Sequence, residues 1–408
     1  MDLSSNNPVR IAEELREILM RRIETDWRFA SEALSRERRA LLGNGSALMT
    51  ELQLEPIPRY GGTETGEQAL RAAAGLSGHE ARTLLEALFG VSADRVRLFS
   101  HQAAALTVAL SREDRHNPVI TSGTGSGKTE SFLLPVLARL LREARTWRRP
   151  PAVPWWEQAS GHWRPLRQAS PDAAVRAVVL YPMNALVEDQ IARLRRTLRR
   201  LRQMGGPEIW FGRYTSATPG GSGPLPSTSA DRRVVDVGKS LRTLQQEFED
   251  LAGLDPHVLG QFQDPRHDEM VTRWDMIAAA PDILVTNYSM LNVMLMRRLE
   301  SPIFESTRRW LKKDPAHVFT LVVDELHLYR GTQGAEVALI LRSLADRLGL
   351  EPDSPQFRVI ATSASMDADR STYLEQFFGL PLDSFARIPG EPLPVSASLP
   401  ISATHLRE

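Results

Sequence analysis

The stretch TSGTGSGKTESF, residues 121–132, places three glycines and one lysine between two apolar runs. Glycines let backbone N–H groups converge on one point, and the following helix adds its positive end, so the stretch suits a phosphate group. Its spacing fits the phosphate-loop pattern, with Ser122 where the general pattern has glycine. The residues expected to line the phosphates are Ser122, Gly123, Thr124, Gly125, Ser126, Gly127, Lys128 and Thr129.

This pattern assigns two side chains to a nucleoside triphosphate. Lys128 is expected to reach the β- and γ-phosphates, and Thr129 to hold a magnesium ion. The simpler alternative is a glycine-rich turn that happens to contain Gly-Lys-Thr. The apolar run PVI before the loop and the helical pattern ESFLLPVLARLL after it favour the phosphate loop.

A second chemical group follows another apolar run. In FTLVVDELHLYRG, five apolar or β-branched residues lead to Asp324 and Glu325, which predicts a buried strand with two carboxylates at its tip. Asp324 is expected to hold the magnesium ion and Glu325 to orient and deprotonate an attacking water. An Asp-Glu pair alone is common on protein surfaces, so the prediction depends on the phosphate loop.

The elements that must position these groups alternate between short apolar runs and helical patterns. The runs PVI, AVVLY, ILVTN, TLVVDE and RVIATSAS are each followed by small or polar residues. This rhythm predicts an α/β fold in three layers, with a central, mostly parallel sheet and crossover helices. The candidate groups then fall at the carboxyl ends of strands, where such sheets bind ligands.

The chain divides into three expected regions. Residues 1–95 form a small helical N-terminal region, and 96–385 form the α/β domain, with insertions at about 146–172 and 205–275. Residues 386–408 are expected to be a linker. Ser/Gly/Pro-rich sequence within the second insertion predicts a mobile loop, and the first insertion holds four tryptophans among prolines.

Composition limits the partners and the compartment. Lys and Arg total 50, as do Asp and Glu, so a nucleic-acid site would have to be a local patch. The absence of cysteine excludes disulfides and thiolate metal sites. We expect a cytoplasmic protein without a membrane partner, because no basic-then-apolar leader or membrane-length apolar run is present.

The motifs together resemble a known family. TSGTGSGKTESF and DELH resemble motifs I and II of superfamily 2 helicases of the DEAD/DEAH-box kind. FSHQ, YPMNALVEDQ, ILVTNYSML and TSAS resemble the family's glutamine motif and motifs Ia, Ib and III in the right order. The resemblance covers about residues 96–385. Within the superfamily, the motifs look most like large bacterial phage-defence helicases of the DISARM and Druantia type and related DNA-repair helicases.

The resemblance implies a RecA-like, ATP-binding domain and assigns further residues. Gln102 would recognise the adenine of ATP, with Phe99 and His101 flanking or stacking on the base. Nucleic-acid contacts are implied for Pro182, Met183, Asn184, Thr286, Asn287 and Tyr288. Residues that would couple the γ-phosphate site to a second domain and to the nucleic-acid face are His327, Ser363, Ala364 and Ser365.

Each assignment has a simpler alternative. Gln102 could be exposed at a helix start, Asn184 could cap a helix, and His327 could be structural. The arginine-rich stretch IARLRRTLRRLRQ is either a solvated amphipathic helix or a patch for DNA phosphates. The tryptophans could stack on bases but more often pack on themselves or on a subunit. The triplet TPG at Thr218–Gly220 spells the DEAD-box form of motif Ib, but we expect an ordinary turn because no strand is predicted before it.

The resemblance also implies a second RecA-like domain, whose arginines point at the γ-phosphate. Nothing after residue 385 resembles it, so we expect a fragment or split gene that binds ATP and hydrolyses it slowly. The leading hypothesis is the ATP-binding half of a nucleic-acid-dependent helicase or translocase, with DNA the expected substrate. The second domain would act in cis or in trans, and defence-system subunits are possible partners. The alternative is a non-motor ATP-dependent clamp or assembly subunit.

Overall fold

The computed structural model describes residues 8–44, 47–49, 59–111, 116–123, 125–148, 151–158, 163–167, 173–220, 223–226, 231–251, 253–364 and 371–393. The chain separates into two compact units. One unit comprises Met1–Pro58 with Leu393–Glu408, and the other is Arg59–Pro392. The larger unit therefore starts before residue 96, where the sequence placed the beginning of the α/β domain, and extends past residue 385.

The smaller unit contains two helices within the N-terminal region that the sequence predicts to be helical. These are α1 (Pro8–Asp26) and α2 (Glu32–Gly43). Arg39 of α2 joins them, because its guanidinium lies 2.9 Å from the carboxylates of both Glu17 and Glu24 on α1. No described helix is both long and apolar enough to cross a membrane.

The larger unit is built on an eight-stranded sheet in which every pairing is parallel, in the order β10-β3-β9-β8-β4-β7-β5-β6. The strands are β3 (Asn117–Thr121), β4 (Ala177–Tyr181), β5 (Phe211–Tyr214), β6 (Glu269–Met270), β7 (Ile283–Asn287), β8 (Phe319–Val323), β9 (Phe357–Ser363) and β10 (Phe385–Pro389). A separate antiparallel pair joins β1 (Gly62–Thr65) to β2 (Arg97–Phe99).

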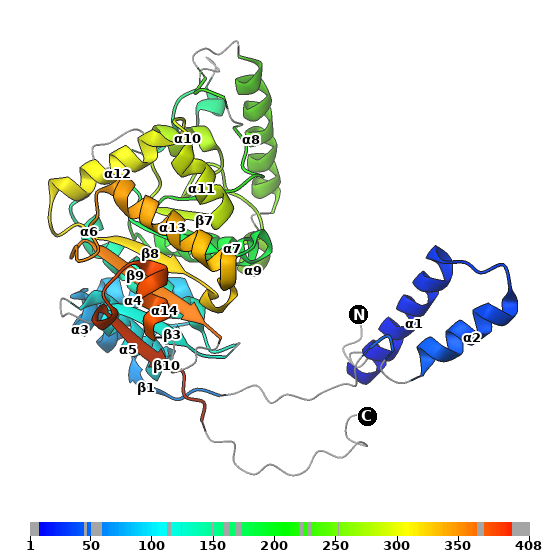
Figure 1. Cartoon of the computed structure of the whole chain (residues 1–408). Coiled ribbons are helices and arrows are strands. Elements are labelled where there is room, and N and C mark those ends of the chain that lie inside the picture. The colour runs from blue at the N-terminus through cyan, green and yellow to red at the C-terminus, as the bar shows by residue number, and fades with distance from the viewer. Residues whose placement is uncertain are drawn as a thin grey trace. The chain divides into compact units, whose positions relative to one another are not determined.

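Helices cover both faces of this sheet (Figure 1). One face carries α3 (Gly66–Ala74), α4 (Gly78–Phe89), α5 (Ser100–Leu110), α6 (Lys128–Ala144) and α7 (Asn184–Gln203). The other carries α8 (Arg232–Asp250), α10 (Arg273–Ala278), α11 (Tyr288–Met296), α12 (Ser301–Lys313), α13 (Gly331–Leu348) and α14 (Ser371–Phe378). The short helix α9 (Pro256–Leu259) lies against α7. The predicted three-layer α/β fold with a parallel sheet is confirmed.

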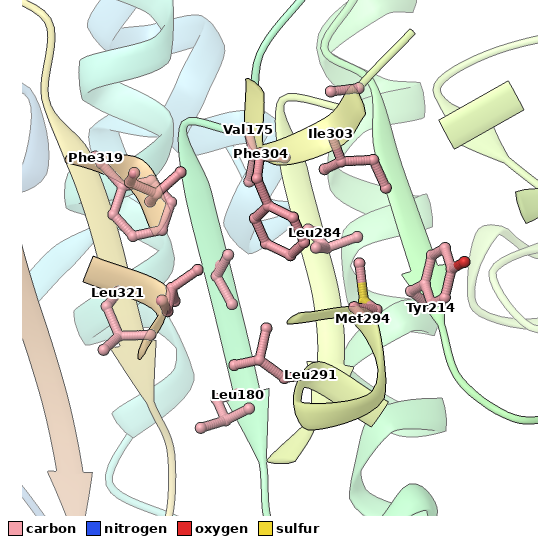
Figure 2. Packing of buried hydrophobic residues seen from close by; sticks show 14 of the residues in the cluster. Val175, Leu180, Tyr214, Leu284, Leu291, Met294, Ile303, Phe304, Phe319 and Leu321 are labelled. Carbon is pink, nitrogen blue, oxygen red and sulfur yellow. The ribbon is translucent and has the colours of Figure 1, made fainter. Parts of the chain in front are cut away.

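Alternation of side chains along the strands divides the core into two layers. In β4, Val178 and Leu180 face one layer while the residues between them face the other. Figure 2 shows the first layer, where Leu180 lies beside Leu291 of α11, and Phe319 and Leu321 lie along β8. Because both faces are covered, the central strands β4 and β8 consist mainly of apolar residues, which is why the sequence predicted them.

The two expected insertions have different structures. Trp155 and Trp156 form a short 3₁₀ helix, η3 (Trp155–Glu157), and are 2% exposed. They pack on α8, where the Trp156 indole N–H donates to Gln245 Oε1 at 2.9 Å. Region 205–275 includes β5 and β6 of the main sheet. It is therefore only partly an insertion, because the sheet continues through it.

Candidate functional site

The phosphate loop and the carboxylate pair lie at one edge of the sheet. The loop follows β3 and the pair follows β8, with β9 between these strands. Since the three strands are parallel, their carboxyl ends point the same way. Lys128 Nζ lies 3.4 Å from Glu325 Oε1, although the two residues are far apart in the chain. Lys128 and the carboxylate pair therefore lie together, as expected if both bind one nucleotide.

The loop itself has the backbone of an anion-binding turn. Gly125 and Gly127 have φ values of 76° and 72°, the left-handed conformation that glycine adopts without strain. Alternating such residues with right-handed ones directs successive N–H groups into a concavity that suits phosphate. Lys128 then begins α6. Thr124 lies outside the described residues.

Two serines brace the loop from inside. The hydroxyls of Ser122 and Ser126 lie 2.6 Å apart and both side chains are buried. Ser122, at the position where the general pattern has glycine, also donates its backbone N–H to the carbonyl of Ser363 at 3.2 Å. The serine therefore fixes the start of the loop instead of leaving it free.

Gln102 is part of this loop's support and is not solvent-exposed. Its Oε1 accepts from the Phe99 N–H at 3.0 Å, and its Nε2 donates to the Gly127 carbonyl at 3.1 Å. Each end of the carboxamide keeps one further hydrogen-bonding capacity. The exposed alternative is thus wrong, and recognition of adenine stays a prediction.

An aromatic cluster lies beside Gln102, and of its members the sequence analysis named Phe99 and His101 but not Tyr60. Tyr60 packs edge-on against the His101 ring, with centroids 5.3 Å apart, while Phe99 stacks on His101 at 5.7 Å. His101 Nε2 lies 2.9 Å from the Ser126 carbonyl, and burial lowers the pKa of this histidine. Because the His101 ring is 1% exposed, it supports the loop and cannot stack on a base in this structure.

Asp324 is a buried carboxylate held by two donors. The Thr362 hydroxyl donates to Asp324 Oδ1, and the Glu325 N–H donates to the same oxygen at 3.0 Å. Burial raises the pKa of Asp324 and the charge of Glu325 raises it further, while Thr362 and Lys128 oppose the rise. Thr362 adjoins the predicted coupling residues but was not among them.

Glu325 has a strained backbone. Its φ is 52° and its ψ is 47°, a left-handed conformation that costs a residue with a side chain about 1–3 kcal/mol. The turn aims the carboxylate back toward the loop, where it meets Lys128. Strain of this kind clusters at functional sites, and here it is found on the residue assigned as the base.

The predicted coupling residues connect the three loops. His327 Nδ1 lies 3.3 Å from Glu325 Oε2 and 3.4 Å from the N–H of Ala364. Through these contacts His327 joins the carboxylate pair to the end of β9. Ser363 contributes its carbonyl to the phosphate loop, as described above. Ser365 lies outside the described residues.

The residues predicted to bind nucleic acid are grouped at the same sheet edge, after β4 and β7, which are neighbouring strands. Met183 is 56% exposed and Pro182 is partly exposed. Asn184 is the first residue of α7, and Met183 occupies the N-cap position, so Asn184 is not the cap. The side chain of Asn184 lies outside the described residues.

The segment after β7 uses its polar side chains within the fold. The Thr286 hydroxyl is buried and donates to the Tyr214 carbonyl at 2.7 Å. Asn287 caps α11 by accepting from the Met290 N–H at 2.8 Å. Tyr288 packs edge-on against Tyr329. Of these three predicted contacts, Thr286 cannot reach a ligand in this conformation.

The arginine-rich helix is amphipathic, as one of its two alternatives states, but several of its arginines have partners within the fold. Arg195 of α7 is 6% exposed and makes a two-pronged ion pair with Glu269, with N···O distances of 2.6 and 2.7 Å. Arg202 pairs with Asp268 at 3.0 Å, and the Arg199 guanidinium lies 4.4 Å from the centre of the Phe248 ring. Arg195 is thus not available to DNA, and Arg199 and Arg202 are engaged by partners distant in sequence.

The triplet TPG is a turn, as expected, but the reason given for it was wrong. Strand β5 ends at Tyr214, so a strand does precede the triplet. Thr218 is buried and its hydroxyl donates to the Arg213 carbonyl at 2.7 Å, while the Thr215 N–H donates to it at 3.0 Å. The threonine closes the turn and is not directed outward.

The residues present fit a magnesium nucleotide. Thr129 and Asp324 offer hydroxyl and carboxylate oxygens, the ligand types that magnesium prefers. The left-handed glycines of the loop provide the phosphate concavity, and Lys128 and Glu325 lie at its border. Glu325 Oε2 is a buried atom that accepts no hydrogen bond among the described residues, because the nearby His327 Nδ1 accepts from the Ala364 N–H, so part of this site is polar and unsatisfied.

Comparisons with known proteins agree with this site. Residues 99–210 match the DEAD/DEAH box helicase family. The chain is 33% identical over 419 aligned residues to Druantia protein DruE of Escherichia coli (strain UMEA 4076-1), an alignment that covers 90% of this chain and 21% of that protein. The chain thus spans about a fifth of the length of this relative.

Two solved structures are also similar. DUF1998 helicase MrfA bound to DNA and AMPPNP has a TM-score of 0.44 and 19% identity, covering 82% of this chain and 31% of that one. DEAD-box helicase Mss116 bound to ssRNA and UDP-BeF has a TM-score of 0.43 and 14% identity, covering 83% and 47%. The assignment rests on the family match and not on these structures: residues 99–210 carry a DEAD/DEAH box helicase domain.

Proposed function

We propose that Arg59–Pro392 is the ATP-binding half of a nucleic-acid-dependent superfamily 2 helicase or translocase. The observation that carries the proposal is the 3.4 Å contact between Lys128 Nζ and Glu325 Oε1, with Asp324 adjacent. A phosphate-binding cation and a candidate base are thereby placed at one point of the sheet edge. The ATP-hydrolysing activity implied by the family is supported by this arrangement.

In the proposed reaction, the phosphates lie along the loop that ends at Gly127. Lys128 exchanges its contact with Glu325 for a contact with the β- and γ-phosphates, because phosphate oxygens carry more charge than one carboxylate. That exchange frees Glu325 to orient a water toward the γ-phosphate and to accept its proton. His327, which contacts Glu325 and Ala364, then senses the state of this carboxylate.

Thr129 and Asp324 would hold the magnesium ion. When bound, the ion neutralises charge on the phosphates and lowers the barrier to their transfer. Burial raises the pKa of Asp324 and so works against its charged form. Binding of a cation opposes this tendency, so metal binding and deprotonation of Asp324 should occur together.

We propose DNA as the nucleic acid and phage defence or DNA repair as the setting. The similarity to a Druantia protein supports the defence role, since the motifs resemble helicases of that type. Met183 and Pro182 would contact the strand's backbone at the end of β4 without reading sequence. A second RecA-like domain, in cis or in trans, would supply the arginines that complete the site, and defence-system subunits are the proposed partners.

An ATPase assay with and without single-stranded DNA or RNA tests the proposal. The chain by itself should bind ATP and hydrolyse it slowly, because missing arginine fingers cost about 10³–10⁵ in rate. Lys128→Ala should lose ATP binding, whereas Glu325→Gln should keep it and lose turnover.

Two results would count against the motor. ATP binding without any stimulation by DNA or RNA, even after a second domain is supplied, would favour the non-motor clamp or assembly subunit. If the unaltered chain binds no ATP, both functions are excluded. Equal behaviour of the unaltered chain and Lys128→Ala would remove the phosphate loop from the account.

A further inference from the structure

Helix α7 contacts the first turn of the phosphate-loop helix. Gln190, on the second turn of α7, donates from Nε2 to the Thr129 hydroxyl at 3.1 Å. One turn later, Arg193 forms an ion pair with Glu130, the next residue of α6. Residues 190 and 193 are three apart and so lie on one face of the helix. Two adjacent residues of α6 are thus held by two side chains of α7.

The contact to Thr129 leaves half of the Gln190 carboxamide unused. Gln190 Oε1 is buried and has no hydrogen-bond partner within the described part of the chain. A buried polar atom without a partner is costly and therefore rare, and a bound ion or water is one of its common explanations. The unused oxygen and the N–H that holds Thr129 are bonded to the same carbon, so the oxygen lies beside the hydroxyl assigned to magnesium.

The chemistry of Gln190 Oε1 indicates what kind of group it would bind. A carboxamide oxygen is an acceptor only, so it requires a donor. Magnesium keeps several waters when it binds to proteins, and these waters donate strongly to nearby acceptors. Groups that hold metal ligands through hydrogen bonds commonly affect metal affinity as much as some ligands do. The hydroxyl of Thr129 can meanwhile accept from Gln190 and still offer its second lone pair.

We propose that Gln190 is a positioning residue for the magnesium site: its N–H fixes the Thr129 hydroxyl and its oxygen accepts from a magnesium-bound water. This inference rests on the proposed function, since it takes a magnesium nucleotide as the ligand. Gln190 belongs to the helix that starts beside Met183, the exposed residue assigned to nucleic acid. A movement of the start of α7 would therefore be transmitted to the metal site, because the first two turns of this helix join Met183 to Gln190.

Binding of a fluorescent ATP analogue tests the inference without relying on hydrolysis. The analogue is titrated in EDTA and then at increasing Mg²⁺ concentrations. Gln190→Ala should raise the Mg²⁺ concentration for half-maximal binding about tenfold, the usual effect of removing a group that holds a metal ligand. Its affinity in EDTA should stay within about twofold of the unaltered chain, because the phosphate loop is intact. Gln203→Ala, at the exposed end of the same helix, is the matched control and should change neither quantity.

Gln190→Glu guards against a general loss of structure, because it keeps the shape and an acceptor oxygen. It should need no more than about threefold more Mg²⁺ than the unaltered chain, since its carboxylate can accept both from the Thr129 O–H, in place of the lost N–H contact, and from a metal-bound water. An equal loss of affinity in EDTA and in Mg²⁺ for Gln190→Ala would show a structural brace and overturn the inference. Unchanged Mg²⁺ dependence would also overturn it, while leaving the proposed function in place. If the unaltered chain binds no analogue, both this inference and the proposed function are wrong.

Discussion

Replacing Thr362 with valine should destabilise the larger unit in a way that depends on pH. The Thr362 hydroxyl and the Glu325 N–H both donate to Asp324 Oδ1. Valine has nearly the same shape but no hydroxyl, so the substitution removes one donor without opening a cavity. The buried carboxylate of Asp324 then keeps its charge with less compensation.

The size of the effect follows from the charge of the acceptor. A hydrogen bond to a charged group contributes about 2 kcal/mol net, against about 1 kcal/mol for a neutral pair. The unit has roughly 330 residues, and an unfolding entropy of about 2.1 cal/mol/K per residue gives about 0.7 kcal/mol/K. A loss of about 2 kcal/mol should therefore lower the Tm by about 3 °C.

The sign of the pH dependence follows from the pKa of Asp324, which burial raises and the Thr362 hydrogen bond lowers. Removing the hydroxyl raises this pKa further in the folded protein. A carboxyl with a raised folded-state pKa contributes stability that is present below its unfolded pKa and is lost as the pH rises through the folded value. Thr362→Val should therefore be most destabilising at high pH, and in acid, where Asp324 is neutral, it should cost only about 1 kcal/mol.

Thermal unfolding between about pH 5 and about pH 8 measures this dependence. Asp324→Asn provides the control background, because it removes the charge. There the same substitution should cost about 1 kcal/mol at every pH. Asp324→Asn alone should raise the Tm near neutral pH, since it removes an incompletely compensated buried charge. A loss for Thr362→Val that is independent of pH, or equal in both backgrounds, would refute the reasoning.

Three further substitutions test other parts of the structure. Gly127→Ala should cost about 2 kcal/mol by thermal unfolding, since its φ is 72° and a Cβ would lie 2.4 Å from Gln102 Nε2; unchanged stability would contradict the loop geometry. Trp156→Ala should lower the free energy of unfolding by about 4 kcal/mol, as measured with guanidinium. A variant that keeps its stability but binds single-stranded DNA more weakly would instead support base stacking. Glu269→Ala should cost about 4 kcal/mol by leaving Arg195 buried and unpaired, and if it only strengthens DNA binding, the arginine is free after all.

The sequence was sufficient for β3, β4, β7, β8 and β9, which are neighbours in the sheet, and for the convergence of Lys128 with Glu325. Strands buried on both faces consist mainly of apolar residues, and parallel strands bring their carboxyl ends to one edge. Motifs that follow such strands must therefore meet. Strand β5 was missed because its residues, FGRY, include a glycine and an arginine and form no apolar run.

Three supporting residues could not be found in this way. Tyr60, Thr362 and Gln190 reach the site from different elements, and each contact joins groups that are remote in sequence. Tyr60 lies in a stretch whose prolines and glycines indicated only a break between helices. Thr362 and Gln190 are within quoted motifs, but nothing in their local spacing tells which atom they bind.

The arginines of α7 show the opposite limit. The sequence shows the charges of these arginines and their helical spacing, but their acidic partners, Asp268 and Glu269, lie more than sixty residues later in the chain. Spacing gives the face of a helix on which a charge lies and does not give what covers that face. The choice between solvent and DNA was therefore incomplete, because a third possibility, an internal ion pair, depends on the tertiary fold.

Strand β9 serves the loops on both sides of it with different chemical groups. Ser363 anchors the phosphate loop through its main-chain oxygen, which any amino acid would supply. Thr362 supports Asp324 through a hydroxyl, which only a few side chains possess. A substitution at position 362 can thus change the environment of Asp324 while the main-chain bond from Ser363 to the phosphate loop stays the same. Related enzymes can therefore differ in metal preference and still bind nucleotide.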